Sequence, residues 1–186
     1  MSSDKKGKLI VISGPSGTGK GTVISELLKM CPELDFSVSV TTRKPRPNEV
    51  DGIEYKFISY EYFQEMIKNN EFLEHARYVG EFYGTPVKPI IESINSGHNI
   101  ILDIEVQGAK QVMEKDIDAI TIFITAPDMK ELKKRLRGRG TDSKEKIHKR
   151  LERARQELNE KVHYDHIIIN DNASRAAGEI LDIIKK

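Results

Sequence analysis

The sequence of 186 residues has little cysteine, no long apolar run and almost no net charge. Cys31 is the only cysteine, which excludes an internal disulfide and suits a reducing compartment. No apolar run reaches the roughly 18 residues of a membrane-spanning helix, and the short run after the polar start is not typical of a signal peptide. These absences predict a cytoplasmic protein with no membrane partner.

Other kinds of site are also disfavoured. The five histidines are scattered and show no metal-ligand spacing with the one cysteine, so a zinc site is not expected. No nucleophile elbow with a serine, histidine and aspartate is present. The length suits one compact domain with a real core, either as a monomer or as a homodimer.

The net charge of +1 conceals one strongly basic segment. Residues 130–155 contain twelve lysines or arginines and four acids, a local net charge of +8, which leaves −7 for the remainder. The segment suits anions. Nucleic-acid binding through it would predict steeply salt-dependent affinity, and the acidic remainder argues against a nucleic-acid partner.

Alternating strand and helix patterns predict an α/β fold with a parallel central sheet. The expected strands are residues 9–12, 35–42, 99–105, 119–125 and a buried strand at 166–169. A first helix is expected from Thr22. The other expected helices span residues 60–68, 88–96, 107–115, 129–137, 143–161 and 173–186. In the first helix the expected apolar face is Val23, Leu27, Leu28 and Met30. Residues 36–88 have hairpin-like spacing, with strands at 54–58 and 72–79, and predict a small inserted lobe.

A glycine-rich turn joins the first strand to the first helix. Its residues are Gly14, Pro15, Ser16, Gly17, Thr18, Gly19, Lys20, Gly21 and Thr22. The glycines let backbone N–H groups turn inward, where they, the helix dipole and the lysine can hold a phosphate chain. The alternative is a plain turn with an exposed lysine. Because strand, turn and helix occur in the required order, the motif predicts a nucleoside triphosphate site.

The loop departs from the strict motif at one position. Gly21 stands where a serine or threonine would reach magnesium, and the hydroxyl comes one residue later, at Thr22. We expect Thr22 to bond a phosphate oxygen while waters complete the metal shell. Direct ligation of Mg²⁺ by this loop therefore stays open.

Two acids follow the apolar run of residues 100–102. Asp103 and Glu105 would project to the same side of a strand and could hold magnesium, directly or through water. Because ligands bind at the carboxyl ends of parallel strands, the position favours function for Asp103. For Glu105, function and a plain surface position are equally open.

Two groups of arginines have both a functional and an ordinary interpretation. Arg43 and Arg46 flank Pro45 in a stiff loop, and with Tyr55 and Tyr83 they could grip a phosphate, or they could simply be solvated. The basic segment could be a solvated helix, or a lid that closes on phosphates and excludes water. We favour the lid, whose candidate arginines are Arg135, Arg139, Arg150 and Arg153.

Eight segments together resemble the guanylate kinase family, and the resemblance extends from Leu9 to the last helix. They are GPSGTGK at 14–20, SVSVTTRKPR at 37–46, DGIEY at 51–55, EFLE at 71–74, YGT at 83–85, LDIEVQG at 102–108, RLRGRGT at 135–141 and IND at 169–171. The resemblance implies a P-loop three-layer α/β/α core at about 1–36, 88–129 and 159–186. It also implies a mixed α/β GMP-binding lobe at about 37–87 and a helical lid at about 130–158.

The resemblance also implies an activity and roles for matching residues. The implied reaction transfers the γ-phosphoryl group of ATP, bound with Mg²⁺, to GMP or deoxy-GMP, with ATP and GMP as the partners. Lys20 and the loop amides would hold ATP phosphates, with Asn170 and Asp171 near the adenine. The GMP-binding residues would be Ser39, Arg43, Arg46, Tyr55, Glu74, Tyr83, Thr85, Asp103 and Glu105. The catalytic residues would be Lys20, Arg46, Arg139 and Arg150, with Asp103 also near the metal.

The chemistry of Glu74 agrees with a guanine ligand. Guanine presents N1–H and N2–H donors side by side, which suit one carboxylate, whereas adenine presents an acceptor there. Each buried polar group left unpaired costs roughly 1–3 kcal/mol, which favours GMP over AMP. The rival is a guanylate-kinase-like binding module of a scaffold protein. Such modules typically have degraded phosphate loops, whereas this sequence retains Lys20 and the glycines.

Overall fold

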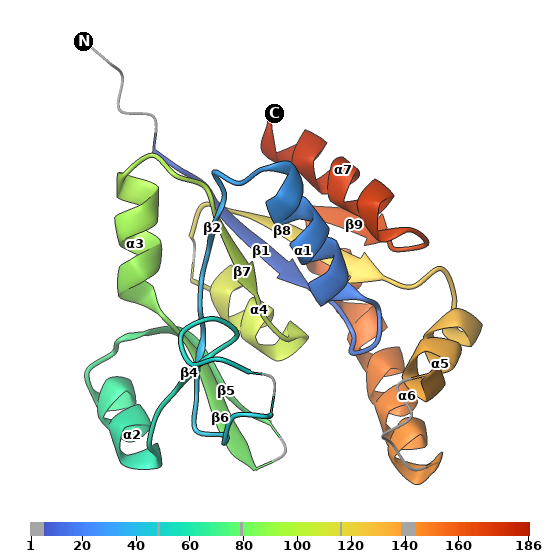
Figure 1. Ribbon diagram of the computed structural model, residues 1–186, viewed down its shortest axis with the longest axis horizontal. Helices are drawn as coiled ribbons and strands as arrows, with labels where there is room; N and C mark the ends of the chain where they lie inside the picture. The colour runs from blue at the N-terminus through green and yellow to red at the C-terminus, as the bar shows by residue number, and fades with distance from the viewer. Residues whose placement is uncertain (1–5, 48, 79, 116, 139–143) are drawn as a thin grey trace. The chain divides into compact units, whose positions relative to one another are not determined.

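The computed structural model describes residues 6–47, 49–78, 80–115, 117–138 and 144–186 (Figure 1). Within this part of the chain, a five-stranded sheet has the order β2-β7-β1-β8-β9. Its strands are β1 (Leu9–Ser13), β2 (Asp35–Phe36), β7 (Ile100–Asp103), β8 (Ala119–Thr125) and β9 (His166–Ile169). The β2–β7 and β8–β9 pairs are parallel, which confirms the predicted α/β class with a parallel sheet.

The chain divides into two compact units. The first, which we call the small-sheet unit, comprises the described residues within 1–9, 35–102 and 107–119. The second, the phosphate-loop unit, comprises 10–34, 103–106 and the described residues within 120–186. The finer division into core, GMP-binding lobe and lid remains a proposal. Among the described residues, no helix combines the length and apolarity needed to span a membrane.

The small-sheet unit contains a four-stranded mixed sheet of order β4-β3-β6-β5. Its strands are β3 (Val40–Thr41), β4 (Lys56–Phe57), β5 (Phe72–Tyr78) and β6 (Glu81–Pro86). Its helices are α2 (Tyr60–Lys68), α3 (Val87–Asn95) and most of α4 (Val106–Met113). The Ser59 hydroxyl caps α2 by accepting from Tyr62 N at 3.1 Å, and Phe63 of α2 packs on Val40 and Phe72. The strands of this mixed sheet lie within residues 36–88, where the sequence showed hairpin-like spacing.

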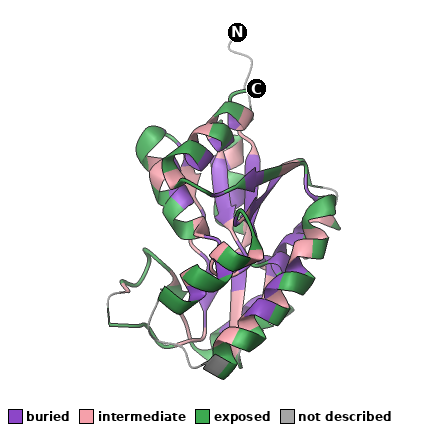
Figure 2. Ribbon diagram, turned by 90° about the vertical axis from the view of Figure 1, so that its right-hand side faces the viewer, coloured by how far each residue is buried: buried purple, intermediate pink, exposed green. Residues whose placement is uncertain are grey.

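The phosphate-loop unit contains α1 (Lys20–Met30), α5 (Met129–Gly138), α6 (Lys144–Asn159), a 3₁₀ turn (Glu160–His163) and α7 (Ala173–Ile184). Helices α1 and α7 lie side by side (Figure 1). Leu132 and Leu136 of α5 pack on Leu151 and Ala154 of α6. Strand β1 is buried at every position, and Figure 2 shows the buried residues concentrated in the strands. The core thus fixes β1, whose end leads into the glycine-rich turn.

The prediction of one strand over residues 35–42 is wrong. The chain leaves the five-stranded sheet after Phe36 and joins the four-stranded sheet at Val40, because β2 pairs with β7 and β3 pairs with β4 and β6. Ser37 and Ser39 are buried, whereas Phe36 is only half-buried. A period-two pattern cannot reveal a change of sheet.

Three further expectations about burial or extent also need correction. In α1 the buried residues are Val23, Ile24 and Leu27, while Met30, the last residue of the helix, is exposed. Strand β9 is an edge strand, so Ile167 and Ile169 are exposed rather than buried. Strand β7 stops at Asp103, two residues earlier than predicted. The expected break at 138–142 lies largely outside the described residues.

Candidate active site

The glycine-rich turn has a backbone that only glycine accommodates. Gly17 and Gly19 have φ values of 93° and 84°, in the left-handed region that side chains rarely adopt. A Cβ on Gly17 would lie 2.7 Å from Leu136 Cδ2, and one on Gly19 would lie 2.6 Å from Asn170 Nδ2. Backbone angle and space therefore both require glycine at these two positions.

Helix α1 begins immediately after Gly19, which has no side chain to cap it. Its first turn contains no acidic residue. The first N–H groups of a helix lack partners within the helix, and the dipole is positive at this end. The start of α1 therefore suits an anionic phosphate group.

Lys20 lies at the start of α1 and is 14% exposed. Its Nζ is 2.7 Å from Asp103 Oδ1 and donates to Ile104 O at 2.9 Å. The structure therefore brings together the predicted lysine and the predicted acid. Glu105 is exposed and follows the end of β7, so the strand-periodicity argument that placed it on the same side as Asp103 is wrong.

Arg135 of α5, one of the candidate lid arginines of the basic segment, donates hydrogen bonds to the main chain at the turn. Its guanidinium donates to Thr18 O and to Asn170 O, both at 2.9 Å, and Glu131 orients it through Nε at 3.0 Å. Asn170 Nδ2 also donates to Thr18 O, at 2.8 Å. The carbonyl of Thr18 is therefore held by two side chains, one of them the predicted adenine-binding Asn170.

Other predicted residues of the phosphate-loop unit have mixed placements. Arg150 of α6 donates to the Ser16 hydroxyl, so one predicted lid arginine contacts the turn. Asp171 pairs with Arg175, which lowers the pKa of its carboxyl. Arg139 lies outside the described residues.

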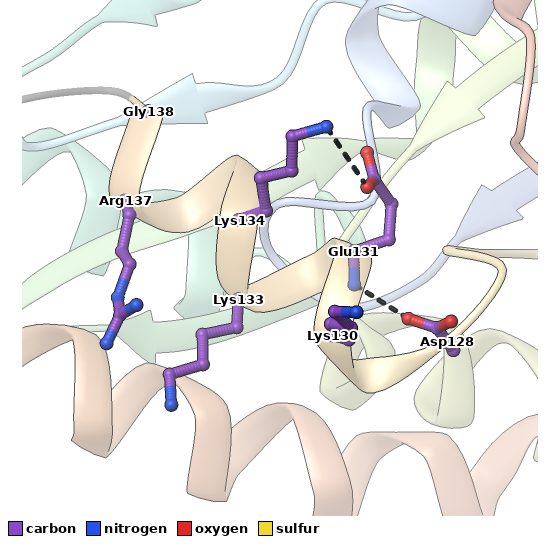
Figure 3. A pocket seen from close by; sticks show the side chains of 7 residues that line it. All are labelled: Asp128, Lys130, Glu131, Lys133, Lys134, Arg137 and Gly138. Carbon is purple, nitrogen blue, oxygen red and sulfur yellow. Dashed lines mark hydrogen bonds and ion pairs between the residues drawn. The ribbon is translucent and has the colours of Figure 1, made fainter.

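The opposite side of α5 carries cations that do not reach the turn. A hollow of about 900 Å³ borders this helix and is lined by Asp128, Lys130, Glu131, Lys133, Lys134, Arg137 and Gly138 (Figure 3). Asp128 caps the helix by accepting from Glu131 N at 2.7 Å, and Lys134 lies 3.7 Å from Glu131. The basic segment therefore has two faces, one on the turn and one solvated.

Another arginine of the basic segment, Arg153, pairs with Glu157, a buried carboxylate of α6. Arg153 Nε donates to Glu157 Oε1 at 2.6 Å. Burial raises the pKa of Glu157, while the bond and charge of Arg153 oppose that rise. No spacing rule pointed to Glu157, because its burial follows from the packing of α6.

The small-sheet unit holds the arginine loop. The two terminal nitrogens of Arg43 bind both oxygens of Glu49, at 2.8 and 2.9 Å, and its guanidinium lies 5.5 Å from the ring centroid of Tyr55. The hydrogen bonds to Glu49 raise the pKa of Arg43, and a hydrogen bond to Tyr83 adds a smaller rise. Arg43, Tyr55 and Tyr83 are thus brought together, whereas the Arg46 side chain in the same loop is 73% exposed.

Glu74 on β5 is the most deeply buried acid among the described residues of this unit, at 5% exposure. The hydroxyl of Thr85, its cross-strand neighbour on β6, donates to Oε1 at 2.6 Å, and Ser39 Oγ lies 3.2 Å from that hydroxyl. Burial raises the pKa of Glu74, and the Thr85 bond and the Lys115 charge oppose the rise. Because a buried carboxylate requires donors, this cluster suits a ligand edge with adjacent N–H groups.

The α/β fold and the glycine-rich turn together place the chain in a class of proteins. This class is the P-loop proteins, which bind nucleoside triphosphates. The family model described as guanylate kinase matches residues 6–186, and the chain belongs to the guanylate kinase family.

Curated relatives agree with this family. The chain is 54% identical over 166 residues to a guanylate kinase of Trichodesmium erythraeum, with 89% of each chain covered. It is 50% identical over 182 residues to one of Streptococcus thermophilus, covering 97% of this chain and 87% of the relative. The crystal structure of guanylate kinase from Anaplasma phagocytophilum matches with a TM-score of 0.79 and 34% identity, over 97% of this chain and 86% of that chain.

Proposed function

We propose that the chain catalyses reversible transfer of the γ-phosphoryl group of ATP to GMP, giving ADP and GDP. A phosphate oxygen of GMP attacks the γ-phosphorus in line, and the bond to the bridging oxygen breaks as ADP leaves. No enzyme nucleophile is required. The observation that carries the proposal is the buried Glu74–Thr85 pair, present in a chain that also has a phosphate-binding turn.

The donor nucleotide is assigned to the phosphate-loop unit. Lys20 and the N–H groups of residues 14–22 bind the phosphates, supported by the glycine backbone and the uncapped start of α1. Arg150 and Arg139 neutralise the transferring group, which has little need of covalent chemistry from the protein. Asn170 and Asp171 lie near the adenine.

The acceptor nucleotide is assigned to the small-sheet unit. Arg43, Arg46, Tyr55 and Tyr83 bind the phosphate of GMP, since guanidinium forks match phosphate oxygens. Binding exchanges the Arg43–Glu49 ion pair for phosphate contacts. Ser39, Glu74 and Thr85 bind the guanine, which can be that of GMP or deoxy-GMP. Asp103 and Glu105, which belong to the phosphate-loop unit, are also assigned to the acceptor.

Magnesium is assigned to ATP, with Asp103 as its protein-side acid. Among the described residues, no group of three or more histidines, cysteines or acids could hold a metal. Such a sparse donor set fits Mg²⁺, which keeps several waters and takes other oxygens from substrate phosphates. Asp103 would hold the ion directly or through water. When bound, the ion neutralises charge on the phosphate oxygens.

The remaining assignments concern the setting of the reaction. The free, buried thiol of Cys31 suits a reducing compartment, which supports a cytoplasmic location. The active species is a monomer or a homodimer and has no nucleic-acid partner.

A coupled assay with each nucleoside monophosphate tests the proposed function. With ATP and magnesium present, GMP should be turned over far faster than AMP, UMP or dTMP, because only guanine pairs both donors with Glu74. Equal or better turnover of any of the other three would overturn the guanine assignment. Titration calorimetry with ATP and with GMP separates the enzyme from a binding module. The enzyme should bind both nucleotides, whereas the module should not.

A further inference from the structure

Helix α4 and the residues that follow it run along the outer edge of β5, the end strand of the four-stranded sheet. Gln111 Nε2 donates to His75 O at 2.8 Å, and Gln111 Oε1 accepts from His75 N at 3.2 Å. Lys115 Nζ donates to Leu73 O. The backbone on both sides of Glu74 is therefore held by this one segment.

Gly108 lies one helical turn before Gln111 and faces the carboxyl group of Glu74. A Cβ on Gly108 would lie 2.9 Å from Glu74 Cδ and closer still to Oε2. Gly108 does not have a positive φ, so its backbone conformation would accept alanine. Glycine is among the least favoured residues inside a helix. Its presence is therefore explained by the space that Glu74 occupies.

We propose that Gly108 is a positioning residue for guanine recognition. Its missing side chain lets the Glu74 carboxyl group lie against α4, while Gln111 and Lys115 hold the strand on either side. The Thr85 hydroxyl donates to Oε1, and Oε2 lies in the space that a Cβ on Gly108 would occupy. The inference rests on the proposed function, in which these oxygens accept N1–H and N2–H of guanine.

Alanine at position 108 should move the carboxyl group without unfolding the chain. The atoms that its Cβ would meet belong to the far end of a flexible side chain, which can rotate away. A displaced carboxylate cannot accept from both donors of guanine. IMP has the N1–H donor but lacks the N2 amine, so its binding should weaken less than that of GMP. The preference for GMP over IMP should therefore fall.

The test compares Gly108→Ala with Gly178→Ala, a matched control inside α7 whose added Cβ meets no heavy atom within 4 Å. Initial rates give kcat and KM for GMP, IMP and ATP. For Gly108→Ala we expect the ratio of kcat/KM for GMP over IMP to fall about tenfold, through a higher KM for GMP. The KM for ATP should be unchanged, and Gly178→Ala should keep the original ratio.

A double variant and a second position make the result decisive. In the Glu74→Gln background, Gly108→Ala should lower the ratio no further, because the two residues act through one contact. Gln111→Ala should lower the ratio in the same direction, and it serves if Gly108→Ala fails to fold. An unchanged ratio in a folded Gly108→Ala, or in Gln111→Ala where that variant replaces it, overturns the inference. If the unmodified enzyme does not prefer GMP to IMP, the proposed role of Glu74 fails instead.

Discussion

The two units prepare their sites for nucleotides by different means. In the phosphate-loop unit, nine consecutive residues, 14–22, supply a glycine backbone, a helix start and Lys20. In the small-sheet unit, Ser39, Glu74 and Thr85 come from separate segments and meet only through sheet register. A phosphate can be bound largely by main-chain groups, whereas a base edge requires buried side-chain oxygens. The first kind of site is therefore local in sequence and the second is not.

Loss of the lysine charge should have the largest effect. Lys20→Met is expected to lower kcat by roughly 10²–10³-fold, the cost typical of removing one preorganised charge-stabilising group. The KM for GMP should change little, because that nucleotide is assigned to the other unit. Steady-state rates over both substrates provide the measurement. Lys29→Met, on the exposed end of α1, is the control and should retain full activity.

Substitution of Glu74, the carboxylate proposed to recognise guanine, should have the next largest effect. It should change only the use of the acceptor nucleotide. Glu74→Gln replaces one acceptor oxygen by an amide donor that faces a guanine donor. We expect roughly 1–3 kcal/mol of lost discrimination between GMP and AMP, with the KM for ATP unchanged. The ratio of kcat/KM for the two monophosphates measures it. Unaltered discrimination would refute the role given to Glu74.

Two neighbouring arginines of α5 separate its two faces. Arg135→Met removes the donors to Thr18 O and Asn170 O and should raise the KM for ATP about tenfold, the typical worth of a charge-assisted hydrogen bond. Arg137→Met, on the solvated face, should leave that KM unchanged. If both variants raise the KM equally, the division of α5 into two faces is incorrect.

The pH dependence of GMP binding should report the burial of Glu74. Because burial raises the pKa of this carboxyl above 4.5, acidification protonates it earlier than an exposed glutamate. The KM for GMP should then rise as pH falls, and Glu74→Gln should abolish that limb. The free energy of unfolding should change with pH in the opposite direction to GMP binding. The folded state binds the proton more tightly, so the stabilisation by protonated Glu74 is lost as pH rises through its folded pKa. Thermal melts over pH, compared with Glu74→Gln, would show this slope.

The smallest effect is expected on the solvated face. Lys133→Gln should change the free energy of unfolding by less than about 0.5 kcal/mol, because exposed charges away from packed features contribute little. Denaturant titration measures the change. A loss of activity in this variant would show that the outer face of α5 contacts a substrate.

Much of the fold could be predicted because the pattern within each element is local. The helix at Tyr60–Lys68 and the strand at Ala119–Thr125 have the predicted bounds, since their periodicity is uninterrupted. The change of sheet between Phe36 and Val40 could not be predicted, because both halves alternate in the same way. The exposure of Ile167 was missed because sequence does not reveal which strand is the edge.

The site shows the same division. The turn and Lys20 could be identified from spacing alone, and the approach of Asp103 to Lys20 follows from its place at the end of β7. Arg135 and Arg137 have the same chemistry two residues apart, and only the packing of α5 distinguishes the one that binds the turn. Gly108 was part of a recognised segment, but its relation to Glu74 depends on tertiary contact.

The central claim is that each unit recognises its own nucleotide by its own means. Calorimetric titration of Lys20→Met and Glu74→Gln, each with ATP and with GMP, tests it most directly. The account predicts a crossed result, in which Lys20→Met weakens ATP and spares GMP, while Glu74→Gln weakens GMP and spares ATP. Equal weakening of both nucleotides by either variant, or unchanged GMP binding by Glu74→Gln, would contradict it.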